Sequence, residues 1–196
     1  MAEESANFRR QVGLPVADGS ADGSADGSTV RIRDAGEDDA GAISAIYNAT
    51  VATTTVAWTE EHESLPTRRK WLAKQGSAGH PVLVAEVGDA VIGFASYGEF
   101  RDATKWPGYR FTVEHTIHIE AGHQGAGVGG ALLEALVARA TAAGLHVMIG
   151  AIDGGNDGSI RFHARHGFVE VARLSEVGFK FGGWLDLVLM QRTLES

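Results

Sequence analysis

The chain has 196 residues, which is enough for one folded domain with a hydrophobic core. Its formal net charge is -8 without a cluster of lysine and arginine, which argues against a protein that binds DNA or RNA. The absence of cysteine excludes disulfides and thiol chemistry. No apolar run reaches the roughly 18 residues of a membrane span, and the N-terminus lacks the apolar core of a secretory signal. We therefore expect a cytoplasmic protein without membrane or nucleic-acid partners.

The N-terminal stretch differs in composition from the rest of the chain. Residues 17–28 read ADGSADGSADGS, a tandem tetrapeptide of small, polar and acidic residues that cannot bury a core. We predict a disordered tail and linker over residues 1–28, followed by a single folded domain over residues 29–196.

The first predicted elements are a strand and two helices. Residues 30–35 alternate apolar and charged side chains, which is typical of an edge strand or a half-buried strand. Asp38 or Asp39 can cap the helix that follows. Residues 51–58, VATTTVAW, are rich in β-branched side chains, so we predict an extended loop or a short strand there. Ser64 then opens a second helix.

A hairpin and an unusual loop come next. Residues 81–87 and 90–100 predict two strands joined by a tight turn at Gly88 and Asp89. Residues 101–110, RDATKWPGYR, form an irregular loop with many charged and aromatic side chains, which is unusual for a mere connector. A further strand, TVEHTIHI, follows this loop.

A glycine-rich turn separates that strand from a long helix over about residues 127–143. The turn, QGAGVGG, can direct several backbone N–H groups at one anion, and the helix dipole adds positive potential. A P-loop is excluded because no Lys-Ser or Lys-Thr follows the glycines. Two alternatives remain at this point. Gly125, Gly127 and Gly130 have the spacing of a dinucleotide fingerprint with Asp153 as its acidic residue, and residues 124–129 fit a pyrophosphate loop of the form [Q/R]-x-x-G-x-[G/A].

The order of the elements bears on this choice. Residues 146–153 are apolar throughout, as in a central strand, and Asn156 or Ser159 starts a short helix that ends at Gly167. Two more strands close the chain, which gives the order β-α-α-β-β-β-α-β-α-β-β. A Rossmann domain places its glycine loop after the first strand and continues with βα units, so this order disfavours the dinucleotide alternative.

The element order and the motif that opens the third long helix resemble the GNAT superfamily of acyl-CoA N-acyltransferases, over about residues 29–194. Within it, several segments resemble the phosphinothricin and methionine sulfoximine N-acetyltransferases, namely AIYNATVATTTVAW, YGEFR, TVEHTIHI, GLHVMIGAIDGGNDGSIRFHARHGF and VGFKFGGWLDLVLMQ. The resemblance implies an α/β fold of the α+β type. Its centre would be a mixed, largely antiparallel, twisted sheet of about seven strands with flanking helices.

The resemblance also implies acetyl-CoA as the co-substrate, bound mainly by main-chain groups. The pyrophosphate would be held by the glycine turn and the start of the helix, which comprise Gln124, Gly125, Ala126, Gly127, Val128, Gly129 and Gly130. The pantetheine amides would pair with the end of the preceding strand, at Ile117, His118 and Ile119. Asn156 and Ser159 would contact the pantetheine arm, although either residue could instead simply cap its helix.

Glu114 is the leading candidate for the general base. Strand alternation puts Glu114, Thr116 and His118 on one face of the sheet. A carboxylate on an apolar central strand is costly unless it is paired or functional, and burial would raise its pKa toward that of a useful base. The resemblance implies the same role, directly or through a water molecule. The alternative is an ion pair with an arginine of the neighbouring loop.

His163 is the second catalytic candidate, because it matches the histidine of the family pattern N-x-x-S-x-x-x-H. The alternative is a histidine that merely packs on its helix. The tyrosine that protonates the leaving thiolate in many members is not evident here, since the comparable stretch holds Phe162 and Phe168. The histidines have no metal-ligand spacing, so we expect no metal.

The acceptor is expected to be a small amino-acid analogue with a carboxylate and a second polar head. Arginine suits both groups because its guanidinium binds oxyanions through two parallel hydrogen bonds. The candidates are Arg101, Tyr109 and Arg110 in the loop, and Glu114, His115 and Thr116 on the strand. The arginines could also simply solvate the loop.

The sequence therefore predicts an N-acetyltransferase that acts by direct attack of the amine on acetyl-CoA. The acceptors implied by the resemblance are methionine sulfoximine, methionine sulfone and phosphinothricin. The alternatives are acetylation of a protein N-terminus or a polyamine, and a non-catalytic CoA-binding module. The resemblance also implies a homodimer, because the KFGGW segment commonly reaches toward the neighbouring subunit in this family.

Overall fold

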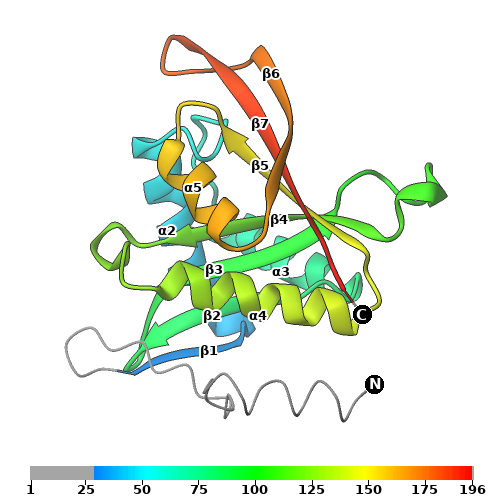
Figure 1. Ribbon diagram of the computed structural model, residues 1–196. Coiled ribbons are helices and arrows are strands. Elements are labelled where there is room, and N and C mark those ends of the chain that lie inside the picture. Colours follow the sequence, from blue (N-terminus) through cyan, green and yellow to red (C-terminus); the bar gives the residue numbers. More distant parts are fainter. Residues whose placement is uncertain (1–28, 196) are drawn as a thin grey trace, which may run out of the picture.

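A computed structural model describes residues 29–195 (Figure 1), and the predicted tail and linker therefore lie outside the described residues. The element order agrees with the sequence prediction throughout. The strands and helices are β1 (Val30–Asp34), α2 (Ala40–Thr53), α3 (Leu65–Ser77), β2 (Val82–Val87), β3 (Ala90–Glu99), β4 (Thr112–Ile119), α4 (Val128–Ala142), β5 (Val147–Asp153), α5 (Asp157–Arg165), β6 (Val169–Lys180) and β7 (Gly183–Thr193). Short 3-10 turns occur at Glu37–Asp39, Pro107–Tyr109 and Ala121–His123.

The strands form one seven-stranded sheet in the order β1-β2-β3-β4-β5-β7-β6. Each neighbouring pair is antiparallel except β4 and β5, which run parallel. The predicted mixed, largely antiparallel sheet is thus confirmed. β4 pairs with β5 only from Thr112 to His115, opposite Val147 to Gly150. Beyond these residues the two strands separate, and Figure 1 shows their ends diverging.

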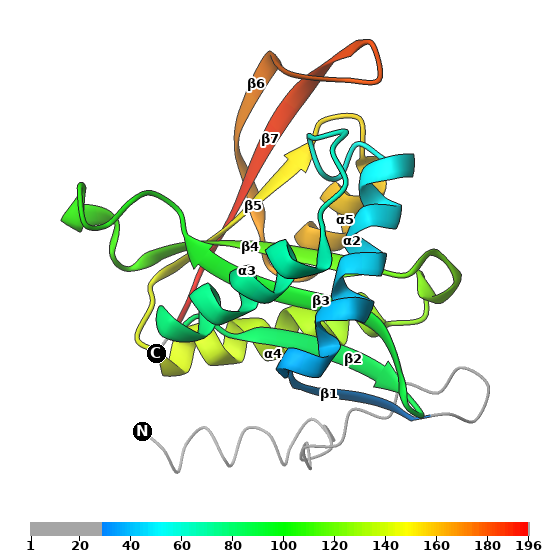
Figure 2. The same ribbon diagram turned by 180° about the vertical axis from the view of Figure 1, so that it is seen from behind.

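Helices cover both faces of the sheet. α4 packs on one face, where Leu132, Leu133 and Leu136 are fully buried, as their helical spacing predicts. α2 and α3 cover the opposite face, where Ile43 of α2 packs with Phe94 of β3. Figure 2 shows this second face of the sheet. The side chains of β4 therefore point alternately toward α4 and toward α2.

Two helix starts are capped as the sequence suggests. The Ser64 hydroxyl accepts a hydrogen bond from the Thr67 N–H at 3.3 Å, which caps α3. The side-chain oxygen of Asn156 accepts from the Ser159 N–H at 3.0 Å, so Asn156 is the cap of α5. The prediction that an aspartate side chain caps α2 is wrong. Asp39 occupies the cap position without a capping hydrogen bond, because its carboxylate accepts from Arg33 and from the Gly36 N–H.

The end of α2 also differs from the prediction. We expected residues 51–58 to be extended, but α2 continues through Thr53 and only residues 54–58 leave the helix. Threonine hydroxyls in this last part bond back to carbonyls four residues earlier, as Thr53 does to Ala49 at 2.8 Å. The β-branched composition was therefore a poor guide, because tertiary contacts at the helix end override it.

Candidate active site

The glycine turn directs backbone N–H groups outward at the start of α4. Gly125 and Gly127 have φ values of 80° and 84°, in the left-handed region that favours glycine. Gly127 is the residue that caps α4, and the Gln124 amide donates to the Ile119 carbonyl at 3.3 Å, which ties the turn to the end of β4. The first N–H groups of an α-helix have no partner within the helix, so this end is suited to an anion.

The remaining residues of the turn shape the start of α4 in different ways. Val128 is buried in the core beneath α4, so its side chain anchors the helix while its N–H stays at the turn. A β-carbon on Gly129 would lie 3.6 Å from the ring of Phe162, and one on Gly130 would lie 3.1 Å from the ring of His166. These glycines let α4 approach α5 closely. Ala126 is exposed at the tip.

The gap between β4 and β5 supplies the second part of a cofactor site. The end of β4 pairs with β3 on one side, through Phe94 and His118 among others, while its other side faces the gap. Ile117 and Ile119 pack against the core beside α4. The main-chain groups of Ile117 and the N–H of Ile119 face the gap and are available to an extended ligand that carries amides, and the adjacent helix N-terminus is available to its phosphates. Both features fit the pantetheine and pyrophosphate expected from the sequence.

The side chain of His118 points away from this gap. It is buried against α2, stacks on Phe94 with ring centroids 4.9 Å apart, and bonds to the Thr116 hydroxyl at 2.9 Å. Desolvation is the larger cause that lowers the pKa of His118 to about 4, and the charge of Arg68 adds to it. The Glu120 N–H bonds to the opposite Ile92 carbonyl, so the alternating ladder also pairs the main chain of His118 with Phe94 of β3. Contact of His118 with a cofactor therefore stays a prediction.

Glu114 lies on the α2 face of β4, in the last part of the strand that pairs with β5. Its register partners are Gly98 on β3 and Ile149 on β5. The carboxylate is half-buried, and burial raises the pKa of Glu114, while the positive charge of Arg101 works in the opposite direction. A carboxyl group with a raised pKa at the mouth of the gap has the properties of a general base.

His115 and His163 form a buried pair on the opposite face. His163 Nδ1 donates to the Ser159 carbonyl at 2.7 Å, so its Nε2 accepts from His115 Nε2 at 3.2 Å. Desolvation is the main cause that lowers the pKa of both histidines, to about 3 for His115. Both ring nitrogens of His163 are engaged in this arrangement. A catalytic role for His163 stays a prediction, and so does acceptor contact by His115, whose ring lies away from Glu114.

This pair should make stability depend on pH. His115 is neutral in the folded protein but protonates in the unfolded chain below its ordinary pKa of 6.5. The contribution to stability is therefore complete above pH 6.5 and is lost as the pH falls toward about 3. When the pH falls from 7 to 5, we expect the free energy of unfolding of the wild type to fall by about 2 kcal/mol more than that of His115→Gln. The glutamine keeps a donor for His163.

Urea denaturation at both pH values measures this difference, and comparison with the wild type cancels the other titrating groups. His62→Gln is the matched control, because it makes the same substitution at an exposed histidine. Equal pH dependence in His115→Gln and wild type would contradict the neutral buried pair.

The predicted acceptor residues are not all brought to Glu114. Arg101 is exposed and its guanidinium lies over the Phe100 ring. Its positive charge nevertheless acts to lower the pKa of Glu114. Arg110 stacks on Phe111 and donates to the Pro107 carbonyl at 3.0 Å. Tyr109 is exposed on the same loop, which extends away from the sheet in Figure 1. Arg101 is thus the loop residue that the structure associates with Glu114.

Sequence reasoning missed two contacts near the gap. The ammonium of Lys180 is buried among backbone carbonyls of the last turn of α2 and the residues after it, and Thr55 bonds to Asp153 at the end of β5. A lysine inside the otherwise apolar run VGFKF was the available signal for the first contact.

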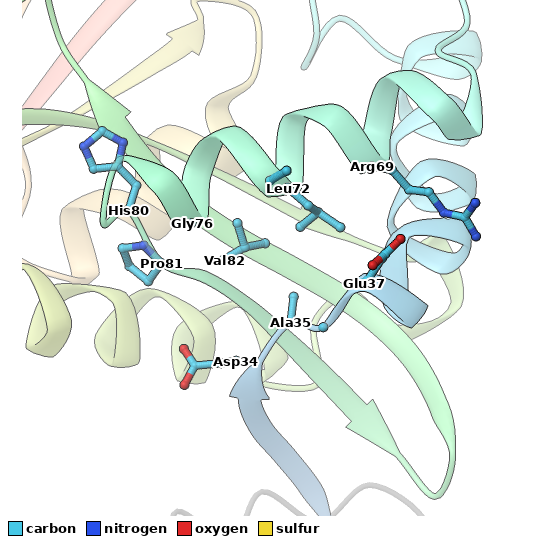
Figure 3. Close-up of a pocket in the computed structure, with 11 residues that line it drawn as sticks. Asp34, Ala35, Glu37, Arg69, Leu72, Gly76, His80, Pro81 and Val82 are labelled. Carbon is cyan, nitrogen blue, oxygen red and sulfur yellow. The ribbon is translucent and has the colours of Figure 1, made fainter.

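A cavity of about 430 Å³ lies elsewhere, between α3 and the segment that follows β1 (Figure 3). Arg69 and Glu37 stand at one end of it and His80 at the other, and none of the residues predicted for the site lines it. Among residues 29–195, no group of three histidine, aspartate or glutamate side chains is placed to hold a metal ion. No helix within that range is long and apolar enough to cross a bilayer.

Known proteins resemble this chain over most of its length. A model of the acetyltransferase (GNAT) family matches residues 43–168. An L-methionine sulfoximine/L-methionine sulfone acetyltransferase from Pseudomonas paraeruginosa is 45% identical, over 84% of this chain and 94% of its own length. A phosphinothricin N-acetyltransferase from Alcaligenes faecalis is 39% identical, over 84% and 83%. A solved phosphinothricin acetyltransferase from Sinorhizobium meliloti, in complex with acetyl-CoA, superposes with a TM-score of 0.80 at 36% identity, over 84% and 88%.

Proposed function

Because the chain belongs to the GNAT family of acetyltransferases, we propose that it moves the acetyl group of acetyl-CoA to the α-amino group of a small amino-acid analogue. The acceptors that we propose are methionine sulfoximine, methionine sulfone and phosphinothricin, on which its relatives are named to act. The proposal also draws on the amino-acid-like chemistry of these acceptors. Each has a carboxylate, which an arginine can bind through two hydrogen bonds, and a second head group with oxygen acceptors.

The observation that carries the proposal is the position of Glu114 beside the gap between β4 and β5. The end of β4 and the N-terminus of α4 would hold the cofactor along this gap. Glu114 would then take a proton from the amine as the nitrogen attacks the thioester carbonyl. The C–S bond breaks, the amide forms, and CoA leaves as a thiolate that takes up a proton from solvent water. No acyl-enzyme is needed, in keeping with the absence of cysteine.

Recognition of the acceptor is proposed to involve residues around Glu114. Arg101 is the best-supported partner for the acceptor carboxylate, because its charge already acts on Glu114. Thr116 lies on the same face of β4 as Glu114 and is a further candidate. Arg110 and Tyr109 could contribute only if the exposed loop at residues 101–110 turned toward the acceptor. Acetyl-CoA is an intracellular metabolite, so we propose that the enzyme works in the cytoplasm.

The test is release of CoA in a mixture of acetyl-CoA and one candidate amine, with the product identified by mass spectrometry. We expect turnover with methionine sulfone, methionine sulfoximine or phosphinothricin. Turnover restricted to spermidine or to N-terminal peptides would favour the polyamine or protein alternative. Binding of acetyl-CoA without turnover of any amine would favour a non-catalytic module.

A homodimer is also proposed, through the β6–β7 hairpin. The hairpin carries several large apolar side chains that are about half exposed or more, namely Val169, Val171, Val177, Phe179, Phe181 and Trp184. Scattered apolar residues on a surface are normal, but a contiguous group along an edge strand is typical of an interface.

We expect Trp184→Glu to shift the protein from dimer to monomer in sedimentation velocity at micromolar concentration. Trp184 is 66% exposed in the single chain, so the charge should not disturb its fold. Leu65→Glu is the control, because Leu65 is an exposed apolar residue on α3, away from the hairpin. A monomeric wild type under these conditions would contradict the proposal.

A further inference from the structure

Lys180, the last residue of β6, has an unusual environment. Its side chain is 2% exposed, and its ammonium donates to three backbone carbonyls, those of Val51 at 2.7 Å, Thr54 at 2.6 Å and Ala57 at 2.7 Å. An ammonium has three donors, so all of them are used. Burying a charge is costly unless its hydrogen bonds are satisfied, and desolvation lowers the pKa of Lys180, with Glu60 acting in the opposite direction.

The three carbonyls belong to one short piece of chain, the last turn of α2 and the residues after it. The last carbonyls of a helix lack intrahelical partners and carry partial negative charge, so a cation there is stabilising. Residues 50–58 contain no glycine that could end the helix in the usual left-handed conformation. Lys180, on a strand distant in sequence, therefore caps the end of α2, and its ammonium fixes the segment at residues 54–58 through the same hydrogen bonds.

Three further contacts join the same segment to β5 and to the β6–β7 hairpin, on the β5 side of the gap. The Thr55 hydroxyl bonds to the Asp153 carboxylate at the end of β5. The Trp58 ring lies on Gly178 of β6, where a β-carbon would be 2.2 Å from the indole. The Phe181 N–H donates to Glu60 at 3.0 Å. These contacts place residues 54–60 against β5 and the β6–β7 hairpin.

In its middle, α2 packs against β4. The Tyr47 ring meets the His118 ring edge-on at 5.6 Å, on the face of the sheet that also holds Glu114. α2 and the segment after it therefore run from β4 to the end of β5, across the region where these strands separate. Figure 2 shows the segment beside the end of β5 and below the hairpin.

We propose that Lys180 is a positioning residue that holds residues 54–58 as one wall of the acceptor site, over the gap between β4 and β5 on the Glu114 face. This inference rests on the proposed function, because it assigns the wall to an amine acceptor. Lys180 does not touch the reacting atoms. Acetyl-CoA is expected to lie along β4 and the N-terminus of α4, so its binding should depend little on this wall.

The test compares Lys180→Met, which leaves the three carbonyls without their donor, with Lys70→Met, in which an exposed lysine on α3 is lost. For Lys180→Met we expect the KM of methionine sulfone to rise at least 10-fold, with the KM of acetyl-CoA and kcat each within about 3-fold of wild type. Amide hydrogen exchange should accelerate in residues 54–58. Lys70→Met should match the wild type in each of these measurements.

Thr55→Val is the second variant, because it removes only the bond to Asp153 and keeps the side-chain volume. It should fold even if Lys180→Met does not, and it should raise the KM of methionine sulfone by a few-fold without raising that of acetyl-CoA. Equal rises in both KM values, or an unchanged acceptor KM despite faster exchange in residues 54–58, would overturn the inference.

The failure of the proposed function would look different. A wild-type protein that acetylates none of the amines counts against the proposed function. The hydrogen-exchange result then decides whether Lys180 holds the segment, and unchanged exchange in both variants would reject this part of the inference as well.

Discussion

Replacement of Glu114 by glutamine is expected to lower kcat/KM for the acceptor by about 100- to 10,000-fold, the range typical for loss of a general base. Glutamine has nearly the same shape and size as the glutamate but cannot take a proton from the amine. Because burial raises the pKa of Glu114, the carboxylate is already costly in the folded protein. The variant should therefore be at least as stable as the wild type.

Thermal unfolding and steady-state kinetics on the same samples separate these effects. Glu99→Gln is the control, because Glu99 ends the adjacent strand but is exposed to solvent. It should keep kcat/KM within a few-fold of wild type. A well-folded Glu114→Gln with undiminished kcat/KM would show that another group accepts the proton.

Substitution of Gly127 by alanine is expected to raise the KM of acetyl-CoA by about 5- to 30-fold. The φ of Gly127 is 84°, a conformation that costs an L-residue about 1–2 kcal/mol. The turn is exposed, so we expect it to relax in the free protein. Binding of acetyl-CoA must then restore the strained conformation of the turn. This cost lowers the affinity for acetyl-CoA tenfold for roughly every 1.4 kcal/mol.

The matched control is Gly122→Ala, a glycine of the preceding 3-10 turn that lacks a positive φ and has open space around it. It should bind acetyl-CoA as the wild type does. Titration calorimetry with CoA measures both variants without any need for turnover. Equal affinities of Gly127→Ala and wild type would remove the glycine turn from the cofactor site.

The features that the sequence predicted well depend on local patterns. The alternation along TVEHTIHI put Glu114 on the opposite face of β4 from His115, and the burial pattern of the strand agrees. The glycine turn was recognisable because its conformation requires particular residues. These patterns, with the element order, were sufficient to predict the sheet.

The predictions that differ from the structure concern contacts between residues far apart in the chain. The end of α2 was misread because its cap, Lys180, lies more than 100 residues away, as its bond to Val51 shows. The burial of the His115–His163 pair depends on how α5 packs on β5, which the pattern around His163 does not reveal. Both loop arginines precede Glu114 in sequence, but Arg101 is the one whose charge acts on the pKa of Glu114.

In the mechanism that we propose, Glu114 accepts the proton of the amine at the gap between β4 and β5. The most direct test is the pH dependence of kcat/KM in the wild type and in Glu114→Gln. A base with a raised pKa loses activity as the pH falls through that pKa, so we predict a rising limb with its midpoint above the ordinary 4.5 of a glutamate. This limb should be absent in Glu114→Gln. An identical limb in both proteins, at similar kcat/KM, would show that Glu114 is not the base.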